Sequence, residues 1–176
     1  MHYADIHPHD IANGPGIRLS LFVSGCTRHC PGCFNEKAQA FDYGEVFTKE
    51  TEQKILEKLD APYYTGVTFL GGEPMEPANR AVLLPLAKAI RARYPKRSIW
   101  CYSGYPYEML EKPAADFLEV LDVLVDGPFI EAQKNIRLLY RGSANQRLID
   151  LNKTRASGRL TLWNPGTVSM HGSEVL

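Results

Sequence analysis

The chain has 176 residues, of which 44% are hydrophobic and 23% are charged, a composition that suits one soluble domain. Its 20 Lys and Arg residues balance 20 Asp and Glu residues, so no overall basic field is present to hold a nucleic acid. No stretch approaches the length of a membrane span, and the N-terminus lacks the basic start and apolar core of a secretion signal. With only four cysteines, we expect a protein of the reducing cytoplasm that contacts no membrane and has no disulfide framework.

Short apolar runs alternate with helical patterns along the chain. Four runs predict strands, at residues 18–23, 67–70, 98–102 and 120–125. Helical patterns lie between them, at residues 49–59, 76–94 and, in at least two pieces, 107–118. Thr48 is suited to cap the first of these helices, and Pro85 should bend or interrupt the second.

Strands separated by helices imply parallel pairing through right-handed crossovers, which is typical of an α/β fold. We expect the sheet to curve into a partial, incomplete β/α barrel, with a doubly wound open sheet as the alternative. Neither repeats nor flexible linkers interrupt the chain, so residues 1–176 are expected to form a single domain. Polar or glycine-rich segments follow each predicted strand, where β/α folds place their active sites, and this favours one shared cleft.

The loop after the first predicted strand contains Cys26, Cys30 and Cys33, one cysteine short of the four that close an ordinary iron–sulfur cluster. A four-iron cluster held by three cysteines keeps one iron without a protein ligand, and that iron can chelate an amine and a carboxylate. With a fourth ligand such as Cys101 or His29, the same loop could instead hold a structural zinc. Cys101 equally fits a buried thiol within a strand.

The C-x3-C-x2-C spacing, with Phe34 directly after the last cysteine, resembles the signature of the radical S-adenosylmethionine (radical SAM) enzymes. The segment Gly71-Gly72-Glu73-Pro74 resembles the "GGE" element of that superfamily, which binds the methionine amino group. Several further segments resemble the anaerobic ribonucleoside-triphosphate reductase activating proteins: residues 10–16, 21–26, 100–105, 126–129 and 141–147. The resemblance covers about residues 3–147, and residues 148–176 carry no recognised motif.

The resemblance implies a [4Fe-4S] cluster with three metal ligands, Cys26, Cys30 and Cys33. It implies a SAM pocket lined by Gly32, Cys33, Phe34, Gly71, Gly72 and Glu73. Reductive cleavage of SAM would give a 5′-deoxyadenosyl radical, which in this family takes a hydrogen atom from a glycine of the large reductase subunit. The implied partners are that subunit, through its glycyl-radical loop, and flavodoxin or a similar low-potential electron donor.

Three alternatives remain open from the sequence. The chain could activate another glycyl-radical enzyme such as pyruvate formate-lyase, act on a small molecule, or serve as a non-catalytic zinc-binding interaction module. The charges are also uneven, because residues 134–159 carry seven basic residues against Asp150 alone, whereas residues 103–131 are mostly acidic. These two blocks are either solvated faces or docking surfaces, and the roles of Asp126 and Arg141 stay open.

Overall fold

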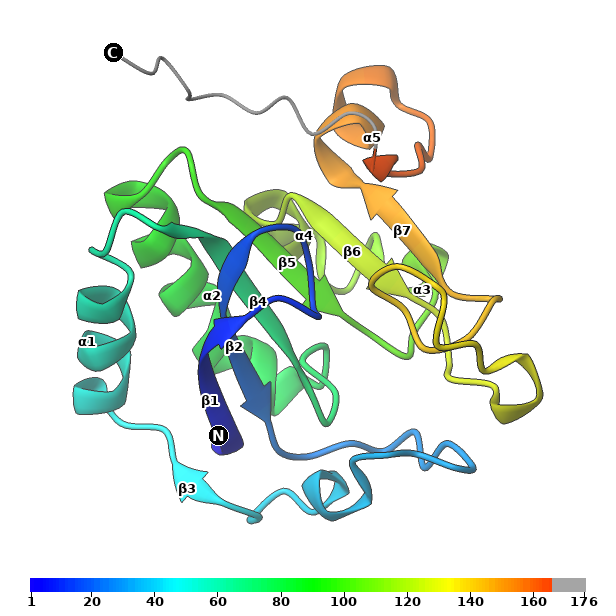
Figure 1. The fold of residues 1–176 in the computed structure, drawn as a ribbon, viewed down its shortest axis with the longest axis horizontal. Coiled ribbons are helices and arrows are strands. Elements are labelled where there is room, and N and C mark those ends of the chain that lie inside the picture. Colours follow the sequence, from blue (N-terminus) through cyan, green and yellow to red (C-terminus); the bar gives the residue numbers. More distant parts are fainter. Residues whose placement is uncertain (166–176) are drawn as a thin grey trace.

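A computed structural model describes residues 1–165 as one seven-stranded mixed sheet with helices packed on it (Figure 1). The strands are β1 (His2–Asp10), β2 (Ile17–Val23), β3 (Glu45–Val46), β4 (Tyr64–Gly71), β5 (Ser98–Tyr102), β6 (Val123–Asp126) and β7 (Arg147–Asp150), in the order β3-β1-β2-β4-β5-β6-β7. The α-helices are α1 (Lys49–Lys58), α2 (Pro77–Arg93), α3 (Tyr107–Leu110), α4 (Ala115–Val120) and α5 (Leu151–Ser157). Within residues 1–165, none of these helices has the length and apolar character needed to cross a bilayer.

The four predicted strands are present as β2, β4, β5 and β6, and they pair in parallel as expected. Thr48 caps α1, where its side chain accepts from the backbone of Thr51. The last strand begins at Val123 instead of residue 120, because residues 115–120 belong to α4. Pro85 was expected to bend or interrupt its helix, and the interruption does not occur, since α2 is continuous. Ala81, whose carbonyl would lose its partner, is exposed on the helix surface, so water can satisfy it.

Sequence patterns did not predict β1, β3 or β7, all of which pair antiparallel. Strand β1 is rich in histidine and half-exposed, so its alternating apolar positions are weak. Strand β7 and helix α5 give part of residues 148–176 a role, because β7 extends the sheet beyond β6 and contributes the buried Leu148 and Ile149. The remainder of that segment, residues 166–176, lies outside the described residues.

The two faces of the sheet differ, because alternate residues of each strand point to opposite sides. One face, which includes Leu19, Phe69, Ile99 and Leu124, packs against buried residues of the α-helices in the main core. The opposite face carries Trp100, Val125 and Leu148 in a second cluster with Tyr140 and Trp163, which lie outside the helices. The doubly wound alternative requires helices on both faces, so it does not describe this sheet.

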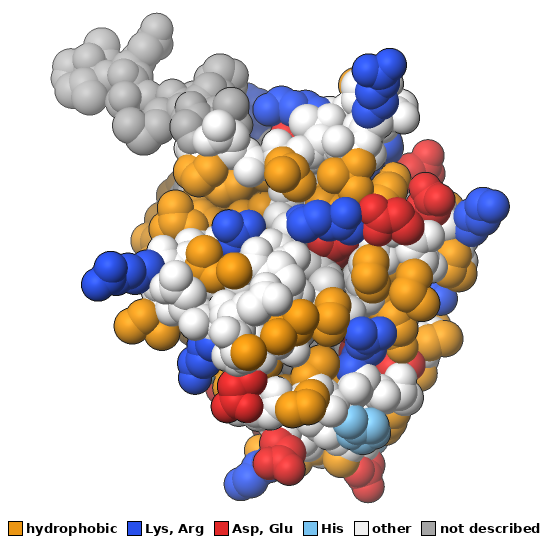
Figure 2. Space-filling model, turned by 90° about the vertical axis from the view of Figure 1, so that its right-hand side faces the viewer, with side chains coloured by type: hydrophobic (Ala, Val, Ile, Leu, Met, Phe, Trp, Pro, Cys, Tyr) orange, Lys and Arg blue, Asp and Glu red, His pale blue; other side chains and the backbone are white. Residues whose placement is uncertain are grey.

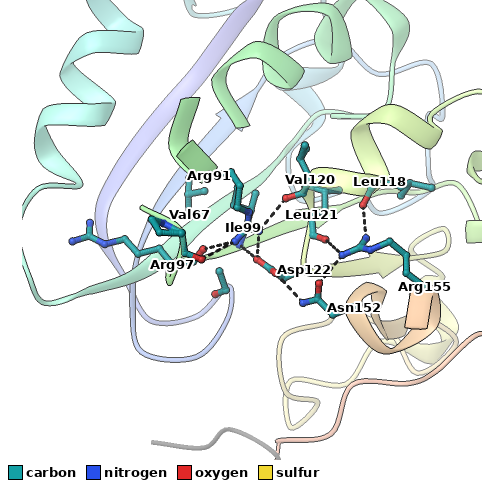
Figure 3. A network of polar contacts seen from close by, with 12 residues as sticks. Val67, Arg91, Arg97, Ile99, Leu118, Val120, Leu121, Asp122, Asn152 and Arg155 are labelled. Carbon is teal, nitrogen blue, oxygen red and sulfur yellow. Dashed lines mark hydrogen bonds and ion pairs between the residues drawn. The ribbon is translucent and has the colours of Figure 1, made fainter. Parts of the chain in front are cut away.

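Polar side chains join the helices to the sheet at the end of the sheet where strands β5 and β6 begin (Figure 3). The Asp122 carboxylate accepts hydrogen bonds from Arg91 Nη2 at 2.6 Å and from the backbone N of Ile99 at 2.7 Å. Its other oxygen accepts from Asn152 Nδ2 at 2.9 Å. Arg155 of the same helix, α5, donates to two backbone carbonyls next to α4. This network therefore fastens α2, β5 and α5 together at the edge remote from the loop that contains the cysteines.

Substitution of Asp122 by Ala should lower the free energy of unfolding by about 2–4 kcal/mol, because three donors lose one largely buried carboxylate. Chemical denaturation followed by circular dichroism measures the change. Glu119→Ala is the matched control, since Glu119 is an exposed carboxylate at the end of α4. Equal stability of the Asp122→Ala and Glu119→Ala proteins would contradict a structural role for the network.

Candidate active site

The loops that follow β2, β4, β5 and β6 meet around one cavity of about 430 Å³. The loops after β2 and β6 project on the right-hand side of the view in Figure 1. All of the predicted site residues line this cavity: Cys26, Cys30, Gly32, Cys33, Phe34, Gly71, Gly72 and Glu73. Gly104 and Gly127, which follow β5 and β6, line it as well. The shared cleft that the sequence favours is therefore present.

The start of α2 fixes the position of the cysteine loop. Glu76 Oε1 accepts hydrogen bonds from the backbone N of Thr27 at 3.0 Å and from its hydroxyl at 2.5 Å. Asn79 Nδ2 donates to the carbonyl of Ser24 at 3.0 Å and to the carbonyl of Glu73 at 2.9 Å. Glu76 and Asn79 are both buried, so these bonds are shielded from water. One helix end thus holds the loop after β2 against the turn after β4.

The glycine pair after β4 permits a close approach between two stretches of protein backbone. Gly72 N donates to the Val23 carbonyl at 2.7 Å. A Cβ on Gly72 would lie 2.7 Å from the Gly25 carbonyl oxygen and 2.8 Å from that of Ala38, closer than such contacts occur. Gly71 has a φ of +109°, which a residue with a side chain rarely adopts. The glycines are therefore needed to bring this turn against the cysteine loop, whatever ligand they contact.

Glu73 joins the turn after β4 to the turn after β5. It is 1% exposed, and its two carboxylate oxygens accept from the backbone N of Met75 at 2.9 Å and of Gly104 at 2.7 Å. Burial raises the pKa of Glu73 from 4.5 to about 7 despite these bonds, which favour the charged form. The side chain is therefore a buried acid that titrates close to neutral pH.

Arg147 links the two charge blocks of the sequence. Its guanidinium pairs with both oxygens of Asp126 and with both oxygens of Glu108. Asp126 is buried and also accepts from the backbone N of Tyr107 at 2.7 Å. These hydrogen bonds raise the pKa of Arg147 and lower that of Glu108. Asp126 is therefore more than a turn residue, and Arg147 is not a free member of a basic docking surface.

Residues 127–146 form the outer wall of the cavity. Asn145 Nδ2 donates to the Pro128 carbonyl at 2.8 Å, and Gln146 Oε1 accepts from the backbone N of Gly142 at 2.9 Å. Arg141 Nη1 donates to the Gln146 carbonyl at 2.9 Å, within the same loop. Sequence patterns did not assign several further residues that line the cavity: Arg28, Tyr102, Ile136 and Tyr140. Of these four, only Arg28 could have been proposed from the sequence, because it lies between the first two cysteines.

The donor set of the cysteine loop fits an iron–sulfur cluster. All three cysteines are free and partly exposed to the cavity, and soft thiolates are the usual ligands of such clusters. Within residues 1–165, no three His, Cys, Asp or Glu side chains are arranged to hold a single metal ion. A cluster binds one thiolate to each iron, so its ligands stand further apart than those of one ion. Burial raises the pKa of Cys26, so its thiol would release a proton to solvent when it binds a metal.

Of the two candidates for a fourth zinc ligand, Cys101 does not line the cavity, and His29 is bonded through one of its ring nitrogens. Cys101 is fully buried in β5, as expected for a strand thiol, and its Sγ donates to the Tyr102 carbonyl at 3.5 Å. His29 Nδ1 lies 2.7 Å from Gln39 Oε1. The geometry therefore excludes Cys101 as the fourth zinc ligand.

Comparison with known proteins identifies the family of this chain. Residues 12–149 match the family model described as a 4Fe-4S single cluster domain. The chain is 40% identical over 148 residues to the anaerobic ribonucleoside-triphosphate reductase-activating protein of Haemophilus influenzae, an alignment that covers 83% of this chain and 96% of the relative. The chain belongs to the anaerobic ribonucleoside-triphosphate reductase-activating protein family.

Other members of the activating-protein family match over a similar length. The protein of Escherichia coli K12 is 39% identical over 148 residues, covering 83% of this chain and 96% of its own length. The protein of enterobacteria phage T4 is 38% identical over 150 residues, covering 84% of this chain and 93% of its own length. Residues 12–149, which match the 4Fe-4S domain model, contain all three cysteines and the Gly71–Glu73 turn. This match supports an iron–sulfur cluster over a zinc module.

Because Glu73 titrates near neutral pH, the free energy of unfolding of this protein should depend on pH. Between pH 4.5 and about 7 the folded protein keeps a proton at Glu73 that the unfolded chain has released. The free energy of unfolding should therefore fall as pH rises through this window, and level off above it. Urea denaturation at several pH values, under reducing conditions, should show a flatter profile for Glu73→Gln than for the wild type. Glu119→Gln is the control, and an unchanged profile in Glu73→Gln would refute the assignment.

Proposed function

We propose that the chain activates an anaerobic ribonucleoside-triphosphate reductase by generating the glycyl radical of its large subunit. The observation that carries the proposal is the cavity at which three free cysteines, and no fourth, meet the Gly71–Glu73 turn. The relatives are named as activating proteins of this reductase, which favours it over another glycyl-radical enzyme such as pyruvate formate-lyase. They equally favour an enzyme over a non-catalytic zinc module.

Cys26, Cys30 and Cys33 would hold a [4Fe-4S] cluster, and residues 32–34 and 71–73 would line the adjoining site for SAM. When bound, the reduced cluster and SAM supply an electron and a 5′-deoxyadenosyl radical that removes a hydrogen atom from a glycine of the reductase. A cavity of about 430 Å³ lies within the range of about 300–1,000 Å³ typical of sites for molecules of this size.

The side chains around the cavity hold the loops that the chemistry needs in fixed positions. Glu73 fastens the turn after β4 to the turn after β5, and Glu76 fastens the cysteine loop to α2. The Asp126–Arg147 pair anchors the outer wall where it leaves β6 and enters β7. These buried bonds restrict the motion of the loops and keep water away from the walls, which limits side reactions of a radical.

The mouth of the cavity suits a polypeptide substrate. Phe34 is 85% exposed and Ile136 is 93% exposed, and both line the cavity, while the neighbouring Leu139 is 56% exposed. Figure 2 views the molecule from the side on which these loops project, and hydrophobic side chains lie there among Lys and Arg. Exposed apolar groups beside polar and basic ones are characteristic of protein interaction sites. This observation favours a protein partner over a small-molecule substrate.

The same proposal covers the architecture and the setting of the protein. The parallel strands β2, β4, β5 and β6, with their carboxyl ends at the cavity, support an incomplete β/α barrel of the radical SAM type formed by a single domain. We take flavodoxin, or a similar low-potential protein, as the electron donor.

Four free cysteines suit a reducing cytoplasm. Of the basic residues considered for docking, Arg137 and Arg141 remain candidates, whereas Arg147 is engaged internally.

Activation of the reductase is tested by anaerobic reconstitution with iron and sulfide, followed by reduction with SAM and the large reductase subunit. Electron paramagnetic resonance should then show a glycyl-radical doublet. Cys30→Ala should lose the doublet and part of its bound iron, because the cluster loses a ligand. Cys101→Ala is the matched control and should keep both, since this thiol is buried in β5. Formation of 5′-deoxyadenosine without a doublet would reject the reductase as the substrate.

Substitution of Ile136 by Glu should weaken binding of the reductase about tenfold or more, because it places a charge at an apolar contact. SAM cleavage in the absence of reductase should not change, since Ile136 is almost fully exposed. Met109→Glu, at a position that is 58% exposed and does not line the cavity, is the control. Equal reductase affinity of the Ile136→Glu and wild-type proteins would show that the partner docks elsewhere.

A further inference from the structure

Arg28 has a side chain without a hydrogen-bond or ion-pair partner among the described residues 1–165, and its Nε is buried. Its backbone N donates to Cys26 Sγ at 3.4 Å, so the residue is part of the cysteine loop itself. A buried N–H group without an acceptor costs about 1–3 kcal/mol, more when it is charged. Such groups are rare in folded proteins, and this one lines the cavity where a ligand can supply the acceptor.

The guanidinium of Arg28 lies against the Tyr105 ring. The guanidinium carbon lies 4.5 Å from the centroid of the Tyr105 ring, within the range of a cation–π contact. The Tyr105 hydroxyl lies 3.3 Å from the Thr27 hydroxyl, which is itself bonded to Glu76. The side chain is thus held between the cysteine loop and the turn after β5, which limits the entropy that it would lose on binding a ligand.

The Glu73 carboxylate lies near the Arg28 side chain. Arg28 Nε lies 3.1 Å, and Glu73 Oε2 lies 3.3 Å, from the point that a Cβ on Gly104 would occupy. The absence of a side chain at Gly104 leaves room for both groups at one place on the cavity wall. Arg28 and the Gly71–Glu73 turn therefore border one part of the cavity wall, where a cationic side chain suits the carboxylate of an α-amino acid.

We propose that Arg28 binds the carboxylate of the amino-acid end of SAM, beside the Gly71–Glu73 turn that receives its ammonium. The inference rests on the proposed function and names the residue that recognises this end of the substrate. A guanidinium presents two parallel N–H donors that match a carboxylate, so the contact gives orientation as well as affinity. Bound in this way, the carboxylate supplies the acceptor that Arg28 Nε lacks.

The other basic residues of the cavity fit this role less well. Arg141 also has a buried Nε without a partner, but it lies on the outer wall, where its Nη1 is bonded to the Gln146 carbonyl. Lys134 is exposed and offers a single charged point instead of a planar fork.

The test compares two ligands that differ only in the carboxylate: SAM and decarboxylated SAM. Equilibrium binding is measured anaerobically on the cluster-loaded protein, with the iron content of each variant determined beforehand. Arg28→Gln should bind SAM about tenfold to a hundredfold more weakly than the wild type does, as expected for loss of a charged hydrogen bond. Its affinity for decarboxylated SAM should match that of the wild type. Arg137→Gln, which changes an exposed arginine outside the cavity lining, should alter neither affinity.

Arg28→Lys keeps the charge and is the second variant if Arg28→Gln loads less iron. It should weaken SAM binding by a smaller factor, again without effect on decarboxylated SAM. Unchanged SAM affinity in Arg28→Gln would overturn the inference, as would equal weakening for both ligands, which would make Arg28 a structural residue stacked on Tyr105. A wild-type protein that binds neither ligand would overturn the SAM chemistry of the proposed function, and this inference with it.

Discussion

Close contact between two backbone segments, the cysteine loop and the turn after β4, is the constraint on which the site depends. Parallel pairing of β2 with β4 continues to Val23 and Gly71, where both strands end. Beyond that point, Glu73 N donates to the Gly25 carbonyl at 2.9 Å, and Gly25 N donates to the Ala38 carbonyl at 2.8 Å. Residues far apart in the sequence therefore approach one cavity through hydrogen bonds between backbone groups. Glycines at this contact serve the fold first, and their proximity to a ligand follows from it.

Local chemistry determined how much of this could be predicted from the sequence. Buried parallel strands are continuous apolar runs, so β4 and β5 were evident, and the cysteine spacing is specific enough to indicate the cluster. Strand β1 could not be recognised from the sequence, because a half-exposed strand near the edge of a sheet needs few apolar residues. The Arg147 contacts with Asp126 and Glu108 also escaped prediction, since charge blocks in a sequence do not reveal which members pair in space. Arg28 illustrates the same limit, because its relation to Gly104 exists only after folding.

The two ends of the parallel strands have different roles. Where β5 and β6 begin, Asp122 and its donors satisfy one another, so that edge contributes to stability. Where the strands end, Arg28 Nε and Arg141 Nε are left without partners among the described residues, as is Arg97 Nη1 at the opposite end of β5. Proteins commonly accept such a cost at sites that bind ligands.

The exposure of the cysteine loop has a consequence for the chemistry of the thiols themselves. Cys26, Cys30 and Cys33 are partly open to the cavity, whereas Cys101 is sealed within β5. Oxidants reach accessible thiols first, and neighbouring thiols can then form disulfides with one another. Exposure to air would therefore damage the three ligands before it affects the core, leaving a folded protein that cannot rebuild its cluster until a reductant restores the loop.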